Sequence, residues 1–180
     1  MRKSCFAIAL AVLVAIASSA FAQDERAEAY MVLEGQIDAS TVIGLVPEGI
    51  RINSELSGEF TEGLFAGATA EWASYLHIRH DGVRVIDNQG YAEHQDGTRV
   101  AWTMKGYFAE PGPPPLEMRI EAMRDPDFEF PDVDFALHGA AWFQTMAPEF
   151  AFVNHTVFRF NGTLNPNQGT VRLTFRSLAE

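Results

Sequence analysis

The dipeptides Asp81-Gly82 and Asp96-Gly97 constrain the fold of this chain more than any other feature of its sequence. Each lies between runs in which apolar and polar residues alternate, and Asp-Gly in that context is the strongest short-range signal for a β-hairpin. Because residues 83–95 follow the first dipeptide and precede the second, the two hairpins share their middle strand. The sequence therefore predicts three consecutive antiparallel strands over residues 72–108.

The register of these strands follows if each turn has a two-residue loop. Trp72 then faces Tyr91, and Tyr91 in turn faces Trp102. Both turns agree on which face of the sheet is mostly apolar, and a one-residue slip in either would reverse that agreement. The face expected inside holds Trp72, Ser74, Leu76, Ile78, Val83, Val85, Asp87, Gln89, Tyr91, Val100, Trp102, Met104 and Phe108, and the face expected outside holds Tyr75, His77, Arg79, Arg84, Asn88, His94, Arg99, Thr103 and Lys105.

Alternation with a period of two residues recurs in the C-terminal part, over 150–160 and 171–176, and strands are also expected over 30–37 and 50–56. One buried and one solvated face is typical of an antiparallel sheet that curls on itself. We therefore predict an all-β protein, a closed antiparallel β-barrel of about eight strands. A chain of 180 residues, 47% of them hydrophobic, fits one such domain.

A proline-rich and acidic insertion near 109–135 is expected to interrupt the barrel. Four prolines at 111 and 113–115 exclude a central strand there, and 125–134 holds five acidic residues. The acidic run lacks the spacing and the central glycine of an EF-hand loop, so we expect a solvated loop rather than a calcium site. Whether the insertion covers the mouth of the barrel is left open.

The N-terminus has the pattern of a secretory signal. Arg2 and Lys3 precede the uncharged stretch 5–17, and Ala20-Phe21-Ala22 matches a signal-peptidase site. The uncharged stretch is shorter than the roughly 20 residues that a membrane-spanning helix needs. We expect residues 1–22 to be a cleaved signal peptide, residues 23–180 a single barrel domain, and the product periplasmic or secreted.

Charge and composition argue against several classes of partner. The formal net charge is −11, and Lys105 is the only lysine after residue 22, so a basic face for nucleic acid is not expected. Arginines on the outer face would meet lipid in a transmembrane barrel, which argues against membrane insertion. His77 and His80 are three residues apart and would point to opposite faces of a strand. No metal site and no cofactor are expected.

Several turn motifs resemble a known family. They are Val46-Pro47-Glu48-Gly49-Ile50-Arg51, Gly58-Glu59-Phe60, Glu62-Gly63, Gly67, Asp81-Gly82, Val85-Ile86-Asp87, Asp96-Gly97 and the later Phe150-Ala-Phe-Val-Asn154. Together they are similar to the uncharacterised bacterial family called domain of unknown function 3237. The resemblance implies a closed antiparallel barrel similar to allene-oxide-cyclase and lipocalin-like barrels, whose interiors hold small apolar molecules. The family supplies no established activity, so a function must be argued from the interior.

The candidate site consists of the polar and aromatic groups expected to point inward. Asp87 is the candidate catalytic acid or base, because a carboxylate that loses its hydration has a raised pKa. A flat apolar ligand would suit an aromatic wall made of Trp72, Tyr91 and Trp102. The other candidate ligand-binding residues are Ser74, Gln89 and Asn154.

Three functions are compatible with this pattern. The first is an exported barrel that binds a small apolar or aromatic molecule in its lumen, without catalysis. The second is a cofactor-free isomerase or cyclase that uses the lumenal carboxylate. The third is a secreted structural or interaction protein whose core is packed solid. Whether the protein is an enzyme, which ligand it takes and what its oligomeric state is are not decided by the sequence.

Overall fold

The computed structural model describes residues 30–178 apart from 110–124, 126, 128 and 131. The signal peptide predicted at 1–22 and the proline-rich part of the predicted insertion lie outside the described residues. Within the described part, no helix is long and apolar enough to cross a bilayer. The elements in chain order are β1 (Tyr30–Val46), β2 (Gly49–Gly63), β3 (Thr69–Arg79), β4 (Arg84–Glu93), β5 (Arg99–Phe108), β6 (Phe135–Thr145), the 3-10 helix η1 (Pro148–His155), β7 (Val157–Asn165) and β8 (Thr170–Ser177).

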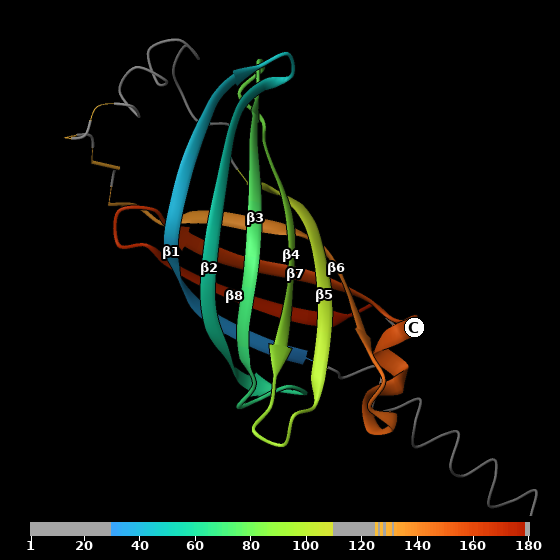
Figure 1. Ribbon diagram of the computed structural model, residues 1–180. Helices are drawn as coiled ribbons and strands as arrows, with labels where there is room; N and C mark the ends of the chain where they lie inside the picture. Colours follow the sequence, from blue (N-terminus) through green and yellow to red (C-terminus); the bar gives the residue numbers. More distant parts are fainter. Residues whose placement is uncertain (1–29, 110–124, 126, 128, 131, 179–180) are drawn as a thin grey trace, which may run out of the picture.

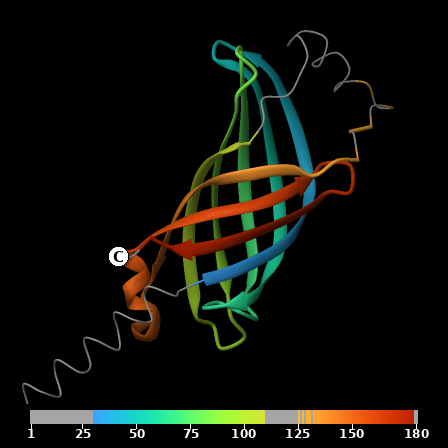
Figure 2. The same cartoon turned by 180° about the vertical axis from the view of Figure 1, so that it is seen from behind.

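The strands form a closed barrel in which each pairs antiparallel with its neighbours in the chain and β1 also pairs with β8. This confirms the predicted fold class. In Figure 1 the strands β1 to β5 stand upright on one side of the barrel, while β6, β7 and β8 cross behind them at a steep angle. Figure 2 shows the same crossing from the other side, with η1 below the end of β6.

The β3–β4 hairpin has a different register from the one predicted. Ser74 pairs with Asn88, one residue earlier than expected. The loop holds three residues rather than two, because the N–H of Arg79 donates to the carbonyl of Val83 at 2.8 Å and closes the loop around 80–82. Gly82 occupies the last loop position with φ +84°, the left-handed conformation that a three-residue hairpin loop requires there.

The β4–β5 hairpin repeats this loop. The N–H of His94 donates to the carbonyl of Thr98 at 2.9 Å, and Gly97 in the loop has φ +85°. Each loop shifts the register by one residue, so the two shifts cancel for β5 and only β4 is turned over. The residues of β3 and β5 therefore have the orientation predicted for them, while those of β4 are reversed. The inward side chains of β4 are Arg84, Ile86, Asn88 and Ala92, and the outward ones are Val85, Asp87, Gln89 and Tyr91.

One end of the barrel is filled by phenylalanine. Phe143 of β6 lies at the centre of this cluster, with ring centroids 5.2 Å from Phe158 and 5.5 Å from Phe175. Phe60 and Phe65 complete it at 6.4 and 5.7 Å from Phe143. All five rings are almost completely buried. Edge-to-face contacts of this kind stabilise a core beyond the area that they bury, so this end of the barrel anchors the fold.

Residues 148–155 form η1 and not the strand predicted from the alternating aromatic residues of 150–160. Pro148 lies in the first turn of the helix. In a 3-10 turn, residues three apart share a face, which directs Phe150 and Val153 toward the barrel. The ring of Phe150 packs against Phe65 at 5.1 Å. From Val157 onward the strand prediction is confirmed, and Phe158 and Phe160 are buried.

The other end of the barrel is uneven, because β1 and β2 have 17 and 15 residues and β7 and β8 only 9 and 8. β1 pairs with β8 from Tyr30 to Gln36, and the N–H of Ile37 then donates to the carbonyl of Gly169 at 2.7 Å. Beyond Ile37, no described strand pairs with this side of β1. The long β1–β2 hairpin thus extends past the β7–β8 turn (Figure 1).

The loop geometry leads to a prediction for Gly97. A Cβ at this position meets no other atom within 4 Å, so the cost of Gly97→Ala comes from the positive φ alone. We expect the free energy of unfolding to fall by about 1 kcal/mol, measured by urea denaturation. Gln95→Ala in the same exposed loop is the control and should leave stability unchanged. Equal stabilities of the two variants would contradict the left-handed conformation of Gly97.

Candidate functional site

A cavity of about 850 Å³ occupies the half of the barrel that the phenylalanine cluster leaves free. It lies toward the end of the barrel that carries the β1–β2, β3–β4 and β7–β8 turns, and every strand contributes to its lining. Residues paired across neighbouring strands lie at the same level, so the walls consist of successive rows that rise from the phenylalanine cluster toward the mouth.

The floor of the cavity is apolar. Leu56 and Trp72 are paired residues of β2 and β3, both are buried, and both line the cavity. The ring centroids of Trp72 and Trp102 are 5.6 Å apart, and the angle between the ring planes is 54°. Trp72 has room because Gly90 stands beside it, where a Cβ would collide with the Cβ of Trp72. Below this floor the barrel is closed by the phenylalanine cluster.

A polar band lies in the next row. It consists of Ser40, Ser54, Ser74 and Asn88, which are paired in succession from β1 to β4, and all four line the cavity. The hydroxyls of Ser40 and Ser54 are 2.7 Å apart and share a hydrogen bond. Asn88 is only 5% exposed, and its Oδ1 is buried without a hydrogen-bond partner in the described structure. Buried polar atoms are normally paired, so this oxygen is an exception among the polar groups of the described barrel wall.

The rows above the polar band are again apolar, and so is the opposite wall. Val42, Ile52, Leu76 and Ile86 form the row above, and Leu137, Leu164, Val171 and Leu173 of β6, β7 and β8 form the opposite wall. The inner part of the cavity is therefore mostly apolar, with a polar band on β1 to β4, while Arg84, Asn167 and Gln168 add polar groups toward the mouth. This composition is typical of small-molecule sites, in which a few placed polar groups orient an apolar ligand.

Arg84 lines the cavity near its mouth, although the sequence predicted it outside. It is 8% exposed, and its guanidinium carbon lies 4.7 Å from the ring centroid of Phe135 and 5.6 Å from that of Phe108. A cation over aromatic faces is attracted by their negative π surface, which stabilises the charge where water is scarce. Arg84 and Asp38 are the charged residues of the described lining.

Side-chain amides close part of the mouth. Nδ2 of the buried Asn165 donates to Oδ1 of Asp132 at 2.8 Å and of Asp134 at 3.1 Å. Nδ2 of Asn167 donates to the carbonyl of Phe130 at 2.8 Å, and Phe130 lines the cavity. The described end of the predicted insertion therefore lies at the mouth, attached to the β7–β8 turn.

Asp87 does not lie in the cavity, and the prediction of a lumenal carboxylate was wrong. Its Oδ2 forms an ion pair with Nζ of Lys105 at 3.1 Å on the outer surface, where 38% of the Asp87 side chain is exposed. The cause is the reversed orientation of β4. For the same reason Gln89 lies outside, where it borders a shallow surface depression with Trp142 and Gln144.

Tyr91 also points outward and takes no part in an aromatic wall. It is 43% exposed, and its hydroxyl donates to Oε2 of Glu71 at 2.8 Å. This hydrogen bond and the negative charge of Glu71 raise the pKa of the Tyr91 phenol above its usual value of 10.0. The predicted wall is thereby reduced to Trp72 and Trp102, which are both buried inside the barrel as expected.

Asn154 lies outside the barrel interior, because it belongs to η1 rather than to a strand. It is exposed, and its amide bonds to Thr145, accepting from the backbone N–H at 2.8 Å and donating to the carbonyl at 3.0 Å. Asn154 therefore joins η1 to the end of β6. Of the predicted ligand-binding residues, Trp72 and Ser74 line the cavity, and Trp102 packs behind Trp72.

Four functional candidates escaped the sequence reasoning: Ser40, Ser54, Arg84 and Asn88. The signal for Arg84 and Asn88 was present, because a glycine after Asp81 fits the last position of a three-residue loop as well as the last position of a two-residue loop. Ser40 lies in a part of β1 where the register shifts between Ile37 and Ala39, and again between Val42 and Gly44. Such bulges break the period of two from which faces are assigned.

Comparison with known proteins supports the fold. A protein of unknown function from Clostridium acetobutylicum superposes with a TM-score of 0.61 at 18% identity, over 83% of this chain and 93% of that one. A β-barrel-like protein from Acinetobacter baumannii gives 0.55 at 19% identity, over 82% and 91%. An enzyme from Penicillium herquei gives 0.53 at 13% identity, over 83% and 94%. At these identities the similarity establishes the barrel fold alone.

No family model and no curated protein sequence matches the chain. The resemblance to domain of unknown function 3237 therefore stays a prediction.

The corrected position of Asp87 is testable. Asp87→Asn removes a solvent-exposed ion pair, and such pairs contribute less than about 1 kcal/mol, so we expect the free energy of unfolding in urea to change by no more than that. Binding of an apolar dye to the cavity should be unaffected, as measured by fluorescence titration. A clear loss of dye binding with stability preserved would return Asp87 to the site.

Proposed function

We propose that this protein binds a small, largely apolar molecule inside the barrel. The observation that carries the proposal is the cavity of about 850 Å³, which lies within the range of roughly 300–1,000 Å³ that is usual for small-molecule sites. A barrel of eight strands has an interior that side chains alone can fill. Here large side chains fill one end, while the other end is lined by serines, medium-sized aliphatic residues and a few rings.

The composition of the walls supports an apolar ligand. Transfer of apolar surface from water into such a cavity is favourable by about 25 cal/mol per Å². The aliphatic wall of β6 to β8 and the row of Ile52, Leu76 and Ile86 would supply this contact. The packed-core alternative, in which the protein offers only its outer surface, expects no such internal space.

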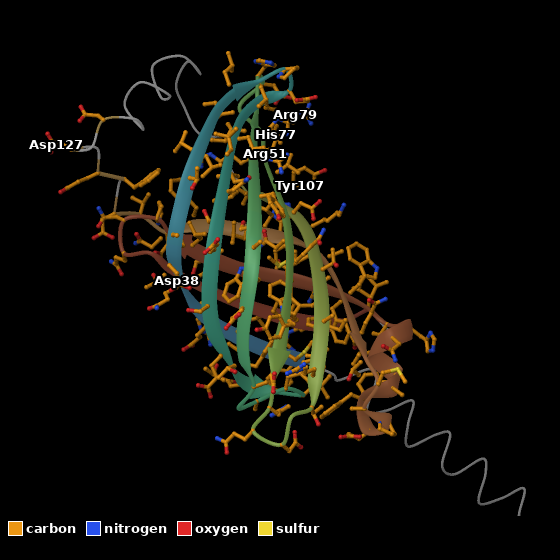
Figure 3. All side chains as sticks on the ribbon, viewed as in Figure 1. Asp38, Arg51, His77, Arg79, Tyr107 and Asp127 are labelled. Carbon is orange, nitrogen blue, oxygen red and sulfur yellow. The ribbon has the colours of Figure 1, made fainter. Side chains whose placement is uncertain are left out.

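The catalytic alternative, a cofactor-free isomerase or cyclase, receives less support. The carboxylate on which it was based, Asp87, lies on the outer face. Asp38 lines the cavity at its edge and is exposed, and Figure 3 shows it on β1. Its Oδ1 accepts a hydrogen bond from Nε2 of Gln36 at 3.1 Å. One protein with a similar barrel is described as an enzyme. An exposed carboxylate such as that of Asp38, however, lacks the desolvation by which burial adapts a carboxyl group to act as a general acid.

Export is part of the same proposal. The pattern of residues 1–22 supports a cleaved signal peptide and a periplasmic or secreted product. The resemblance to domain of unknown function 3237 is compatible with the closed barrel, and we propose that the chain is a divergent relative of that family. Neither proposal is needed for the binding experiment that follows.

Binding in the cavity is tested with the uncharged apolar dye N-phenyl-1-naphthylamine. We expect wild type to enhance the dye's fluorescence with a Kd in the micromolar range. Ser74→Phe places a ring in the polar band and should weaken binding at least tenfold. The matched control is Ala73→Phe, whose side chain lies on the opposite face of the same strand and should leave the Kd unchanged. Urea denaturation of both variants checks that they are folded.

Two results would contradict the proposal: no binding by folded wild type, or equal binding by wild type and folded Ser74→Phe. Native mass spectrometry of protein purified from its own host is an independent measurement. A retained small molecule that disappears in Ser74→Phe and persists in Ala73→Phe would identify the natural ligand.

A further inference from the structure

We infer that the ligand is an organic acid, and that its carboxylate binds Arg84 near the mouth of the cavity while its apolar body extends inward. This inference rests on the proposed function and names the chemical class of the ligand. It comes from three observations: the burial of Arg84, the two rings that contact its guanidinium, and the apolar rows that follow it inward.

Arg84 is the buried charge of the described lining. It is 8% exposed, whereas Asp38, the other charged residue there, is exposed at the edge of the cavity. Solvent screens an exposed charge, and a charge in low-dielectric surroundings acts more strongly on a group beside it. Asp132 and Asp134 are attached to the β7–β8 turn through Nδ2 of Asn165, and neither belongs to the described lining. We therefore expect the inner side of the mouth to favour an anion.

The guanidinium of Arg84 is positioned by two rings. Its central carbon lies 4.7 Å from the ring centroid of Phe135 and 5.6 Å from that of Phe108, and both rings line the cavity. The two rings pack against each other with their centroids 5.9 Å apart. A cation positioned in this way loses little further freedom when an anion binds, which favours affinity. A bidentate carboxylate takes two of the five N–H donors of a guanidinium, so it is compatible with the other contacts of Arg84.

The rows below Arg84 determine where the apolar body lies. Arg84 pairs with Ile78, and Ile86, two residues further along β4, belongs to the next row inward. Gly90, beside Trp72 at the floor, comes six positions after Arg84, which corresponds to about 20 Å along the strand. The facing wall of β6 to β8 is the aliphatic one described above. The cavity therefore has room for an apolar chain or ring system that reaches inward from the carboxylate.

The test compares two probes with the same carbon chain, decanoate and decanol, near neutral pH, where the acid is ionised. Their affinities are measured by displacement of N-phenyl-1-naphthylamine. A cavity without a cation prefers the alcohol, because a carboxylate loses more hydration on burial. We expect the opposite for wild type, with decanoate bound at least roughly tenfold more tightly, the contribution of a charge-assisted hydrogen bond.

Arg84→Gln removes the charge and keeps a polar side chain. We expect decanoate to lose its advantage, while the affinity for decanol stays unchanged. A purely structural role of Arg84 would instead weaken both probes together or neither. If Arg84→Gln does not fold, as judged by urea denaturation, Arg84→Met is used in its place.

Arg79→Gln is the matched control, because it makes the same change at the same end of the barrel (Figure 3). Arg79 is exposed, and its Nη2 forms an ion pair with Oδ2 of Asp81 at 2.7 Å. We expect this variant to keep the wild-type preference. Decylamine, which carries the opposite charge on the same chain, should bind wild type more weakly than decanol does.

The outcomes separate this inference from the proposed function. If the dye does not bind folded wild type, the apolar site and the inference are both overturned. If the dye binds but decanoate is not preferred over decanol, if decylamine is preferred, or if folded Arg84→Gln keeps the preference for decanoate, only the inference is overturned, and the apolar site stands. The comparison within wild type needs no variant, so the inference is tested even if every substitution at Arg84 disrupts folding.

Discussion

The alternation of side chains along paired strands is the constraint on which the rest of this structure depends. In the closed barrel every strand has a neighbour on each side, and β1 joins β8 through Tyr30 to Gln36. A residue then has only two environments, the interior or the outer surface, and a shift of one position exchanges them for a whole strand. Which residues line the cavity therefore depends on the lengths of the loops that connect the strands, and not only on which residues are apolar.

The orientation of β4 shows how far sequence reasoning reaches. The existence of both hairpins, the closed all-β fold and the inward orientation of Trp72 and Trp102 were predicted and are confirmed. The orientation of β4 was wrong, because Asp-Gly is compatible with a two-residue loop and with a three-residue loop that places glycine last. The second loop also has three residues and shifts the register again, so β5 has the predicted faces and only β4 is reversed.

The positions of other residues could not be predicted from the sequence, because local features break the strand pattern. β1 changes register with β2 at three places, so no single period assigns Ser40 to a face. Around Asn154 the aromatic residues alternate as in a strand, but Pro148 and the threefold repeat of a 3-10 turn produce η1. The strand pattern of Val171, Leu173 and Phe175 is unbroken, and there the buried face was correctly recognised.

The two ends of the barrel differ because large and small residues are distributed unequally along the strands. Phe60, Phe143, Phe158 and Phe175 converge at one level and exclude space there. At the levels above, Ser54 and Ser74 stand where larger side chains would fill the interior, and Ile52 and Leu76 follow. The same barrel thus combines a densely packed end that stabilises the fold with an end that contains the cavity.

The short pairing between β1 and β8 has a consequence for how the edge of the cavity can open. Beyond Gln36 the described barrel wall is held on this side by the backbone bond from Ile37 to Gly169, and both residues line the cavity. Where neighbouring strands are paired, the wall is a continuous ladder, and separating two strands there would break several backbone hydrogen bonds at once. Local opening at this seam therefore breaks a single backbone hydrogen bond, and it would widen the edge of the cavity while the paired parts of the strands keep their register.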